Sequence, residues 1–193
     1  TPLAEGASLA MHESQSRLWE NMVGRSLEFW RHFYPSYQKL FPGQLGTVDL
    51  ERFHRAVNKV EPSAIRVEAD EATYNLHIML RFDIERRLID GSLAAKDVPG
   101  AWNSSMKEHL GIEPEDDAHG ALQDVHWAMG AFGYFPSYAL GNAYGAQILR
   151  TMEKDFDVNA AIAAGDLNRI RDWLVEHVFS IASVSPPEEW IRA

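Results

Sequence analysis

Near its start the chain reads His12-Glu13-Ser14-Gln15-Ser16-Arg17-Leu18-Trp19-Glu20-Asn21, a stretch that opens like the metal-binding helix of a zinc protease. In the motif His-Glu-x-x-His, two histidines one helical turn apart face the metal, and the glutamate activates the bound water. Position 16 is a serine here, and the sequence has no other His-Glu pair. The stretch therefore supplies one or two groups to a metal at most, and the other ligands must come from elsewhere.

Apolar residues recur at helical spacing on both sides of this stretch, which predicts one long helix over residues 8–32 that stops near Pro35. Residues 63–68 alternate and favour a short strand. The helical spacing returns in five later segments, which are residues 48–60, 70–89, 101–110, 138–155 and 160–181. Asp157 or Asn159 is the expected cap of the last segment. The sequence therefore predicts a mainly α fold, in one multi-helix domain over residues 1–193, with at most a very short β element.

The composition narrows the classes of partner and metal site. A net charge of -10 disfavours binding to nucleic acid or to an anionic membrane, because those partners are bound by basic patches. No apolar run approaches the roughly 18 residues that a membrane-spanning helix needs. The absence of cysteine fits a reducing compartment, so we expect a cytoplasmic protein. It also leaves His, Asp and Glu as strong metal ligands, which suit zinc, cobalt or manganese.

Four clusters of residues each allow a functional and a structural interpretation. Arg66 can grip a substrate carboxylate through its planar guanidinium, or it can pair with the nearby acids Glu68, Asp70 and Glu71 in a structural network. Glu13 can bind a metal or lie on a solvated helix face.

The other two clusters are the pair Asp124 and His126 and an aromatic block over residues 132–138. Two residues apart, Asp124 and His126 share one side of an extended segment, where the carboxylate can hold one tautomer of the histidine. The phenols of the aromatic block can donate hydrogen bonds to an oxyanion. A packed histidine and an aromatic core patch are the structural alternatives.

Taken together, these stretches resemble peptidase family M32, the thermostable or Taq-type metallocarboxypeptidases. The resemblance rests on three motifs in the family's order: His12-Glu13-Ser14-Gln15, Ile65-Arg66-Val67-Glu68-Ala69-Asp70 and Gly120-Ala121-Leu122-Gln123-Asp124-Val125-His126-Trp127. It extends through essentially the whole chain and includes the stretch Gly133-Tyr134-Phe135-Pro136-Ser137-Tyr138-Ala139-Leu140-Gly141-Asn142. The family implies a mostly helical zincin-like fold with a deep groove, and removal of C-terminal residues from peptides with one divalent metal, zinc before cobalt or manganese.

The resemblance also assigns a role to particular residues of this chain. Glu13 is the expected third metal ligand, and His12 and Gln15 beside it are expected to contact the substrate. Arg66 would receive the terminal carboxylate of the peptide, with Asp124 orienting its neighbours. The remaining roles concern the scissile carbonyl, where His126 and Tyr134 are the expected catalytic residues and Tyr138 is the second choice for the phenol.

The chain departs from the family pattern because the segment with His-Glu-x-x-His is missing. We therefore expect a C-terminal portion of a longer enzyme, inactive by itself, with the metal absent or weakly bound. Its expected partners are the peptide C-terminus, the missing N-terminal part and a second copy in a homodimer. The alternative is a noncatalytic helical module that binds partners. A dimetal helical bundle is disfavoured because paired Glu-x-x-His motifs are missing.

Overall fold

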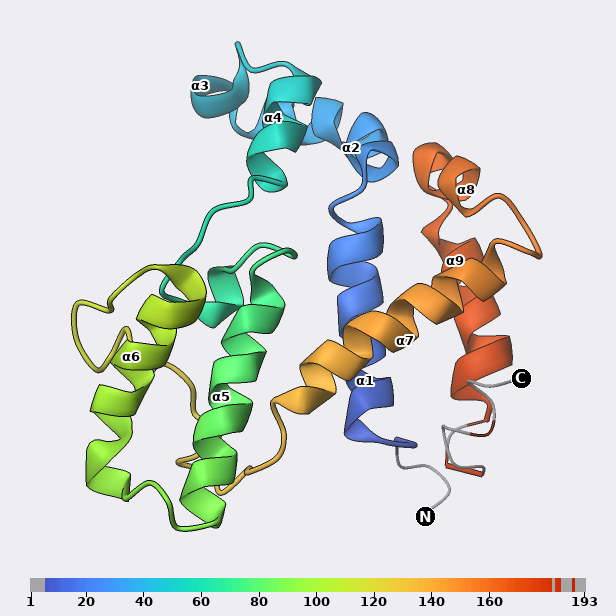
Figure 1. Cartoon of the computed structure of the whole chain (residues 1–193). Helices are drawn as coiled ribbons and strands as arrows, with labels where there is room; N and C mark the ends of the chain where they lie inside the picture. Colours follow the sequence, from blue (N-terminus) through green and yellow to red (C-terminus); the bar gives the residue numbers. More distant parts are fainter. Residues whose placement is uncertain (1–5, 182, 185–188, 190–193) are drawn as a thin grey trace. The chain divides into compact units, whose positions relative to one another are not determined.

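The regular secondary structure is helical throughout the part of the chain that the computed structural model describes, which comprises residues 6–181, 183, 184 and 189 (Figure 1). The predicted mainly α fold is confirmed. Contacts group the chain into two compact units, which are described separately below. We call Thr1–Asn58 with Leu140–Ala193 the terminal unit, and Lys59–Ala139 the middle unit. The single helical domain stays a prediction. No helix in the described residues combines the length and apolar character needed to span a bilayer.

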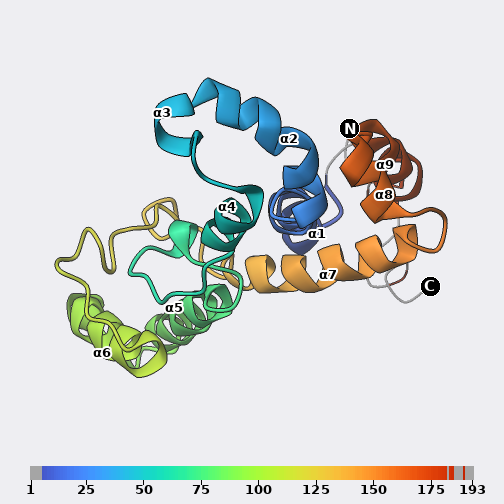
Figure 2. The same cartoon turned by 90° about the horizontal axis from the view of Figure 1, so that it is seen from above.

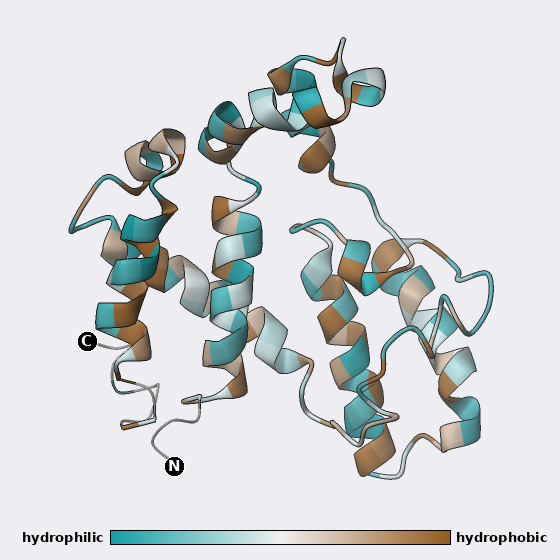
Figure 3. Ribbon diagram, turned by 180° about the vertical axis from the view of Figure 1, so that it is seen from behind, coloured by the Kyte–Doolittle hydropathy of each residue, from teal (hydrophilic) through white to brown (hydrophobic). Residues whose placement is uncertain are grey.

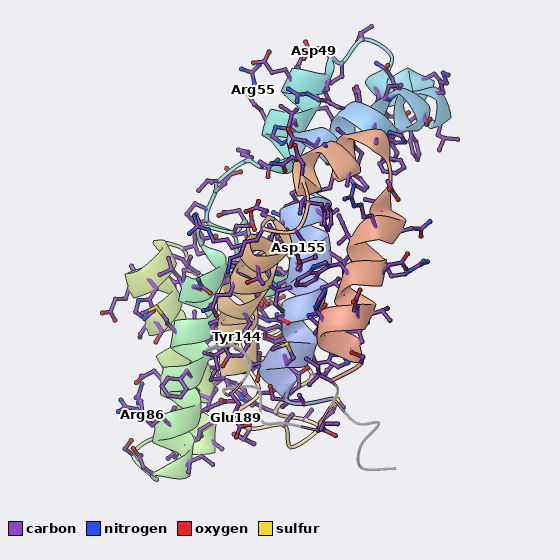
Figure 4. The ribbon with its side chains drawn as sticks, turned by 90° about the vertical axis from the view of Figure 1, so that its right-hand side faces the viewer. Asp49, Arg55, Arg86, Tyr144, Asp155 and Glu189 are labelled. Carbon is purple, nitrogen blue, oxygen red and sulfur yellow. The ribbon has the colours of Figure 1, made fainter. Side chains whose placement is uncertain are left out.

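The terminal unit contains most of the helices. They are α1 (Leu9–Arg17), continued by the π-helical segment η2 (Leu18–Val23), α2 (Leu27–Leu40), α3 (Pro42–Leu45), α4 (Leu50–Val57), most of α7 (Pro136–Met152), α8 (Val158–Ala164), and α9 (Leu167–Leu174), continued by the π-helical segment η5 (Val175–Phe179). Asp49 begins α4 by accepting a hydrogen bond from the backbone N–H of Arg52, and Figure 4 labels Asp49 and Arg55 on this helix. Capping by short polar side chains recurs in this unit.

The prediction of one helix over residues 8–32 was wrong. The helix ends at Gly24, and Ser26 starts α2 by accepting a hydrogen bond from the backbone N–H of Phe29. A serine cap satisfies an N–H at the start of a new helix, which offsets the cost of the break. Pro35 was also expected to end the helix but lies inside α2. Trp30 lies before Pro35 on α2, and its ring centre lies 4.7 Å from that of Phe53 on α4.

The second long helix predicted in this unit, over residues 160–181, is also two helices. Asp157 caps α8, as predicted, by accepting from the backbone N–H of Ala160. Gly165 then ends α8 with a φ of 75°, a left-handed conformation that glycine adopts without steric cost. Asp166 caps α9. Gly165 therefore ends one helix, and Asp166 begins the next.

The core of the terminal unit joins helices that lie far apart in the sequence. Leu18 is fully buried in η2, as are Ile170 and Leu174 in α9, and Met152 at the end of α7. These side chains belong to one hydrophobic cluster, against which Tyr144 of α7 packs (Figure 4). The cluster therefore fixes α1 and η2 against α7 and α9.

The middle unit is built on a pair of helices, α5 (Tyr74–Ile89) and α6 (Val98–Leu110), which lie side by side in Figures 1 and 2. A short 3₁₀ turn, η4 (Ala95–Asp97), precedes α6, and Pro99 occupies the first turn of α6, where its missing N–H has no cost. Their shared core includes Leu80, Ile84, Trp102 and Met106. In Figure 3 hydrophobic and hydrophilic residues mix along α5, which also buries polar side chains.

Two segments of the middle unit have no long helix. The strand favoured over residues 63–68 is absent, and a 3₁₀ turn, η3 (Arg66–Glu68), stands there instead. A turn after η3 is held by Asp70, whose carboxylate accepts from the backbone N–H groups of Ala72 and Thr73. Residues 111–135 form consecutive turns and bends. These two irregular segments carry the residues of the candidate site.

Candidate functional site

Five of the predicted site residues lie together in the middle unit. They come from η3, from the turns over residues 111–135 and from the start of α7: Arg66, Asp124, His126, Tyr134 and Tyr138. We call this group the arginine–tyrosine cluster. Residues 58 positions apart therefore meet in one place, which the local sequence spacing alone could not establish.

Arg66 donates hydrogen bonds through all three nitrogens of its guanidinium. Nε and Nη2 donate to Oδ1 of Asp124 at 3.1 and 2.6 Å, and Nη1 donates to the hydroxyl of Tyr74 at 2.8 Å. The side chain of Arg66 is 6% exposed. A guanidinium carries more N–H groups than these contacts use, so Arg66 keeps donors for a further oxygen ligand.

The structural network of neighbouring acids that the sequence offered for Arg66 was wrong. Asp70 instead accepts from the hydroxyl of Thr73 and from the backbone N–H of Glu61. The acid that pairs with Arg66 is Asp124, and its second oxygen, Oδ2, accepts from Nε of Arg81 at 2.7 Å. One carboxylate therefore bridges two guanidinium groups.

Aromatic rings surround the guanidinium of Arg66. Its carbon Cζ lies 4.7 Å from the centre of the Tyr138 ring and 5.6 Å from that of Phe135. A cation over an aromatic face is attracted by the negative charge on that face. In the aromatic block over residues 132–138, Phe135 is a core residue with 1% exposure, whereas Tyr138 belongs to the cluster.

His126 connects the acid to the phenols. Its Nε2 lies 3.1 Å from the hydroxyl of Tyr138, its Nδ1 lies 3.8 Å from Oδ1 of Asp124, and its ring centre lies 5.2 Å from that of Tyr134. The segment between Asp124 and His126 is turned, whereas the two-residue spacing was interpreted as extended. Asp124 and His126 are nonetheless close to each other, as expected. A half-buried histidine beside two phenols can donate or accept a proton.

The charges in the cluster set its pKa values. Burial raises the pKa of Asp124, but the hydrogen bond from Arg66 and the charge of Arg81 outweigh it and leave that pKa below its usual value. Burial lowers the pKa of Arg66, but the bond to Asp124 outweighs it and the pKa ends above its usual value. Burial and the charge of Arg81 lower the pKa of His77 to about 4. At neutral pH Arg66 and Arg81 are therefore cations, Asp124 is an anion and His77 is neutral.

Sequence reasoning missed Arg81 and Glu85, which support the cluster from α5. Arg81 and Glu85 are buried, and they lie one helical turn apart. Oε1 of Glu85 accepts from Nε1 of Trp127 at 2.9 Å, and Oε2 accepts from the backbone N–H of Gly133 at 3.1 Å. The available signal was the charge at both positions on the helix face that also carries Ile78 and Ile84, because a buried charge needs a partner.

Glu13, His12 and Gln15 lie on α1 in the terminal unit. Oε2 of Glu13 accepts a hydrogen bond from the hydroxyl of Ser16 at 2.9 Å. Gln15 donates to the hydroxyl of Ser14 at 2.9 Å, and His12 is exposed. The roles assigned to these three residues remain predictions.

The described residues do not form a metal site by themselves. Within residues 6–181, 183, 184 and 189, no three His, Asp or Glu side chains come together as ligands. Glu13 offers a carboxylate oxygen, a donor that divalent ions accept, but one carboxylate does not make a tight site. The carboxylate of Glu13 is therefore compatible with one position in the coordination of a divalent ion.

Comparison with known proteins gives the family. The sequence profile of the family described as carboxypeptidase Taq (M32) metallopeptidase matches residues 1–193. Thermostable carboxypeptidase 1 of Thermus thermophilus is 51% identical over 174 residues, which cover 90% of this chain and 34% of that protein. Carboxypeptidase 1 of Bacillus subtilis is 46% identical, over 92% of this chain and 36% of that protein.

Solved structures agree with these matches. The M32 carboxypeptidase of Deinococcus radiodurans is 43% identical and superposes with a TM-score of 0.91, covering 100% of this chain and 39% of that one. The chain thus spans about a third of the length of its curated relatives. The name metallopeptidase implies a divalent metal ion in the family. The chain belongs to the M32 family of metallocarboxypeptidases.

Proposed function

We propose that the intact protein carrying this sequence is a metal-dependent carboxypeptidase, which hydrolyses the C-terminal peptide bond of its substrates. This chain would contribute the residues that recognise the substrate and one ligand of the metal. The observation that carries the proposal is the arginine–tyrosine cluster, because it gathers a histidine and two phenols beside Arg66, and Arg81 next to it makes the charge around Asp124 net positive. Membership of the M32 family supports it.

Arg66 is proposed to bind the terminal carboxylate of the peptide. A guanidinium matches a carboxylate in geometry as well as charge, and Arg66 has N–H groups beyond those that Asp124 and Tyr74 engage. Its covered position strengthens such a bond, since charges attract more strongly where water is excluded. Because the carboxylate lies one residue beyond the scissile bond, this contact would restrict cleavage to the last residue.

His126 and Tyr134 are proposed to donate hydrogen bonds to the oxygen of the scissile carbonyl as negative charge develops on it. Removing a donor of this kind typically costs about 100- to 1000-fold in rate. Tyr138 is the second choice for the phenol, because its hydroxyl lies 3.1 Å from Nε2 of His126 and the two can share a proton. Glu13 is proposed as the metal ligand, with His12 and Gln15 beside it facing the substrate.

The test compares the 193-residue chain with the longer polypeptide that also carries His-Glu-x-x-His. We expect the longer protein to release single C-terminal residues from a model peptide, as measured by mass spectrometry, and the 193-residue chain to release none. We also expect zinc to bind the 193-residue chain more weakly than micromolar in isothermal titration. Submicromolar binding would contradict the assignment, because Glu13 alone cannot provide it. Zinc, cobalt and manganese titrated into the longer protein would identify the metal.

A second candidate function is a noncatalytic helical module that binds partners. The absence of three clustered metal ligands in the described residues is the observation that favours it. A native protein that begins near Thr1 would support this candidate, whereas a longer native polypeptide with His-Glu-x-x-His would support the enzyme. A homodimer and a cytoplasmic location remain predictions, which sedimentation and cell fractionation measure.

A further inference from the structure

We propose that Arg81 is a positioning residue for substrate recognition, acting on Arg66 through Gln123 and Asp124. The inference rests on the proposed function, in which Arg66 binds the terminal carboxylate of the peptide. Arg81 lies in the middle of α5 and is 0% exposed, so it cannot meet a substrate itself. Any effect on recognition must therefore pass through the residues that it contacts.

Arg81 is held rigidly. Nη1 donates to the backbone carbonyl of His77 at 2.9 Å, and the guanidinium carbon lies 4.5 Å from the centre of the Trp102 ring. Nε donates to Oδ2 of Asp124 at 2.7 Å, and Nη2 donates to Oε1 of Gln123 at 2.8 Å. Every nitrogen of the guanidinium thus has a partner in the middle unit, and its planar shape sets the relative positions of Gln123 and Asp124.

The same two residues hold Arg66. Oε1 of Gln123 accepts from the backbone N–H of Arg66 at 2.9 Å, and Oδ1 of Asp124 accepts from Nε and Nη2 of its side chain. Nε2 of Gln123 donates to the backbone carbonyl groups of Ala64 and His119. Gln123 therefore fixes the backbone of Arg66, Asp124 fixes its guanidinium, and Arg81 connects the two.

Arg81 also sets the charge that Arg66 presents. With Asp124 as its sole charged neighbour, Arg66 would form a neutral pair with little attraction for an anion. Arg81 adds a second cation to the same carboxylate, so the three residues carry a net positive charge. His77 adds no charge at neutral pH, because its pKa is about 4. A buried net charge favours an anionic ligand, and the carboxylate of a peptide is such a ligand.

The test uses the intact enzyme and two peptides that differ only in a free or an amidated C-terminus. The measured quantity is the ratio of kcat/KM for the free peptide to kcat/KM for the amide. We expect Arg81→Met to lower this ratio about 30-fold or more, mainly through KM for the free peptide, since breaking a buried charge pair typically has an effect of this size. Arg81→Lys keeps the charge but cannot reach Asp124 and Gln123 at once, so we expect a smaller fall.

The matched control is Arg86→Met, also on α5, where the side chain is 66% exposed and pairs with Asp83. We expect it to leave the ratio unchanged. A purely structural role of Arg81 would lower the melting temperature and slow both peptides equally. An unchanged ratio in folded Arg81→Lys and Arg81→Met would overturn the inference, and the Lys variant alone decides if the Met variant does not fold. Failure of the wild-type enzyme to prefer the free peptide would instead overturn the proposed function.

Discussion

Gly141 of α7 lies so close to Glu13 of α1 that a Cβ atom on the glycine would stand 2.9 Å from the Cβ of Glu13. No side chain fits at that separation, so the close approach of α1 and α7 at this point requires a glycine. One turn later, a Cβ on Gly145 would stand 3.1 Å from the backbone carbonyl oxygen of Ser14. The predicted metal ligand is therefore held at a close contact between two helices of the terminal unit.

The first prediction is that Gly141→Ala displaces Glu13. The added methyl group must push the two helices apart, and overpacking of this kind typically costs about 1–3 kcal/mol of unfolding free energy. Chemical denaturation measures the loss. In the intact enzyme the variant should also bind its metal more weakly, which competition with a chelator measures without any assay of activity. Gly100→Ala on α6 is the control, because nothing lies within 4 Å of the added Cβ. Equal stability of the two variants would refute the tight contact.

A second prediction concerns Glu85, whose carboxylate joins Trp127 and Gly133. Glu85→Gln replaces one acceptor with an amide that faces a donor, so the variant should lose roughly 1–3 kcal/mol. Thermal unfolding measures the change. Glu108→Gln, at an exposed position on α6, should have almost no effect. If both variants melt at the wild-type temperature, Glu85 does not hold the segment between Trp127 and Gly133.

The third prediction is a pH dependence from His77. Neither ring nitrogen has a hydrogen-bond partner among the described residues, and the ring is 0% exposed. Its pKa in the folded state is about 4, below the ordinary value of 6.5. The unfolded chain therefore binds a proton at a higher pH than the folded chain does. The contribution of His77 to the unfolding free energy is fully present above about pH 6.5 and is lost as the pH falls toward 4. At pH 5 the loss is about 2 kcal/mol.

His77→Leu tests this dependence by removing the titrating ring at similar volume. At pH 7 the variant should be within about 1 kcal/mol of wild type, because an unpartnered polar ring is replaced by an apolar group. Between pH 7 and 5 its urea midpoint should fall less than that of wild type. His12→Leu changes an exposed histidine and should keep the wild-type slope. Parallel slopes for wild type and His77→Leu would exclude His77 as the source.

A fourth prediction distinguishes two costs of replacing Gly165, the backbone strain of its left-handed φ and the steric overlap of an added Cβ with His32. Gly165 and Gly91 both have a left-handed φ, of 75° and 80°, which costs alanine roughly 1–2 kcal/mol. A Cβ on Gly165 would also overlap the ring of His32, whereas nothing lies within 4 Å of one on Gly91. Gly165→Ala should therefore destabilise the chain more than Gly91→Ala. Adding His32→Ala to Gly165→Ala should recover the difference, and no recovery would argue against the contact.

The sequence predicts the fold class of this chain better than it predicts where the helices begin and end. Periodicity identifies the longer helices, but it continues through Gly24 and Gly165, where caps by Ser26 and Asp166 start new helices. Such breaks come from a glycine and a polar cap, which hydrophobic spacing does not register, while α2 continues through Pro35 and packs against α4. A local pattern cannot weigh these contacts against helix propensity.

For the candidate site, too, the sequence indicated the residues better than it indicated the contacts between them. Arg66, Asp124 and His126 were identified as candidates from residue type and from the family resemblance. The pairing of Arg66 with Asp124 was not visible in the spacing, which favoured acids near Arg66 in the sequence over an acid 58 positions away. Arg81 was not identified as a site residue because its role depends on sharing Asp124 with Arg66. This is a relationship between three segments of the chain.

The central claim is that Arg66 recognises the free carboxylate of a peptide substrate. The most direct measurement is kcat/KM of the intact enzyme for a free and an amidated peptide, in wild type, in Arg66→Met and in the control Arg86→Met. The account predicts a strong preference for the free peptide in wild type and in the control, and a loss of at least about 100-fold of that preference in Arg66→Met. A folded Arg66→Met enzyme that keeps the wild-type preference would contradict it.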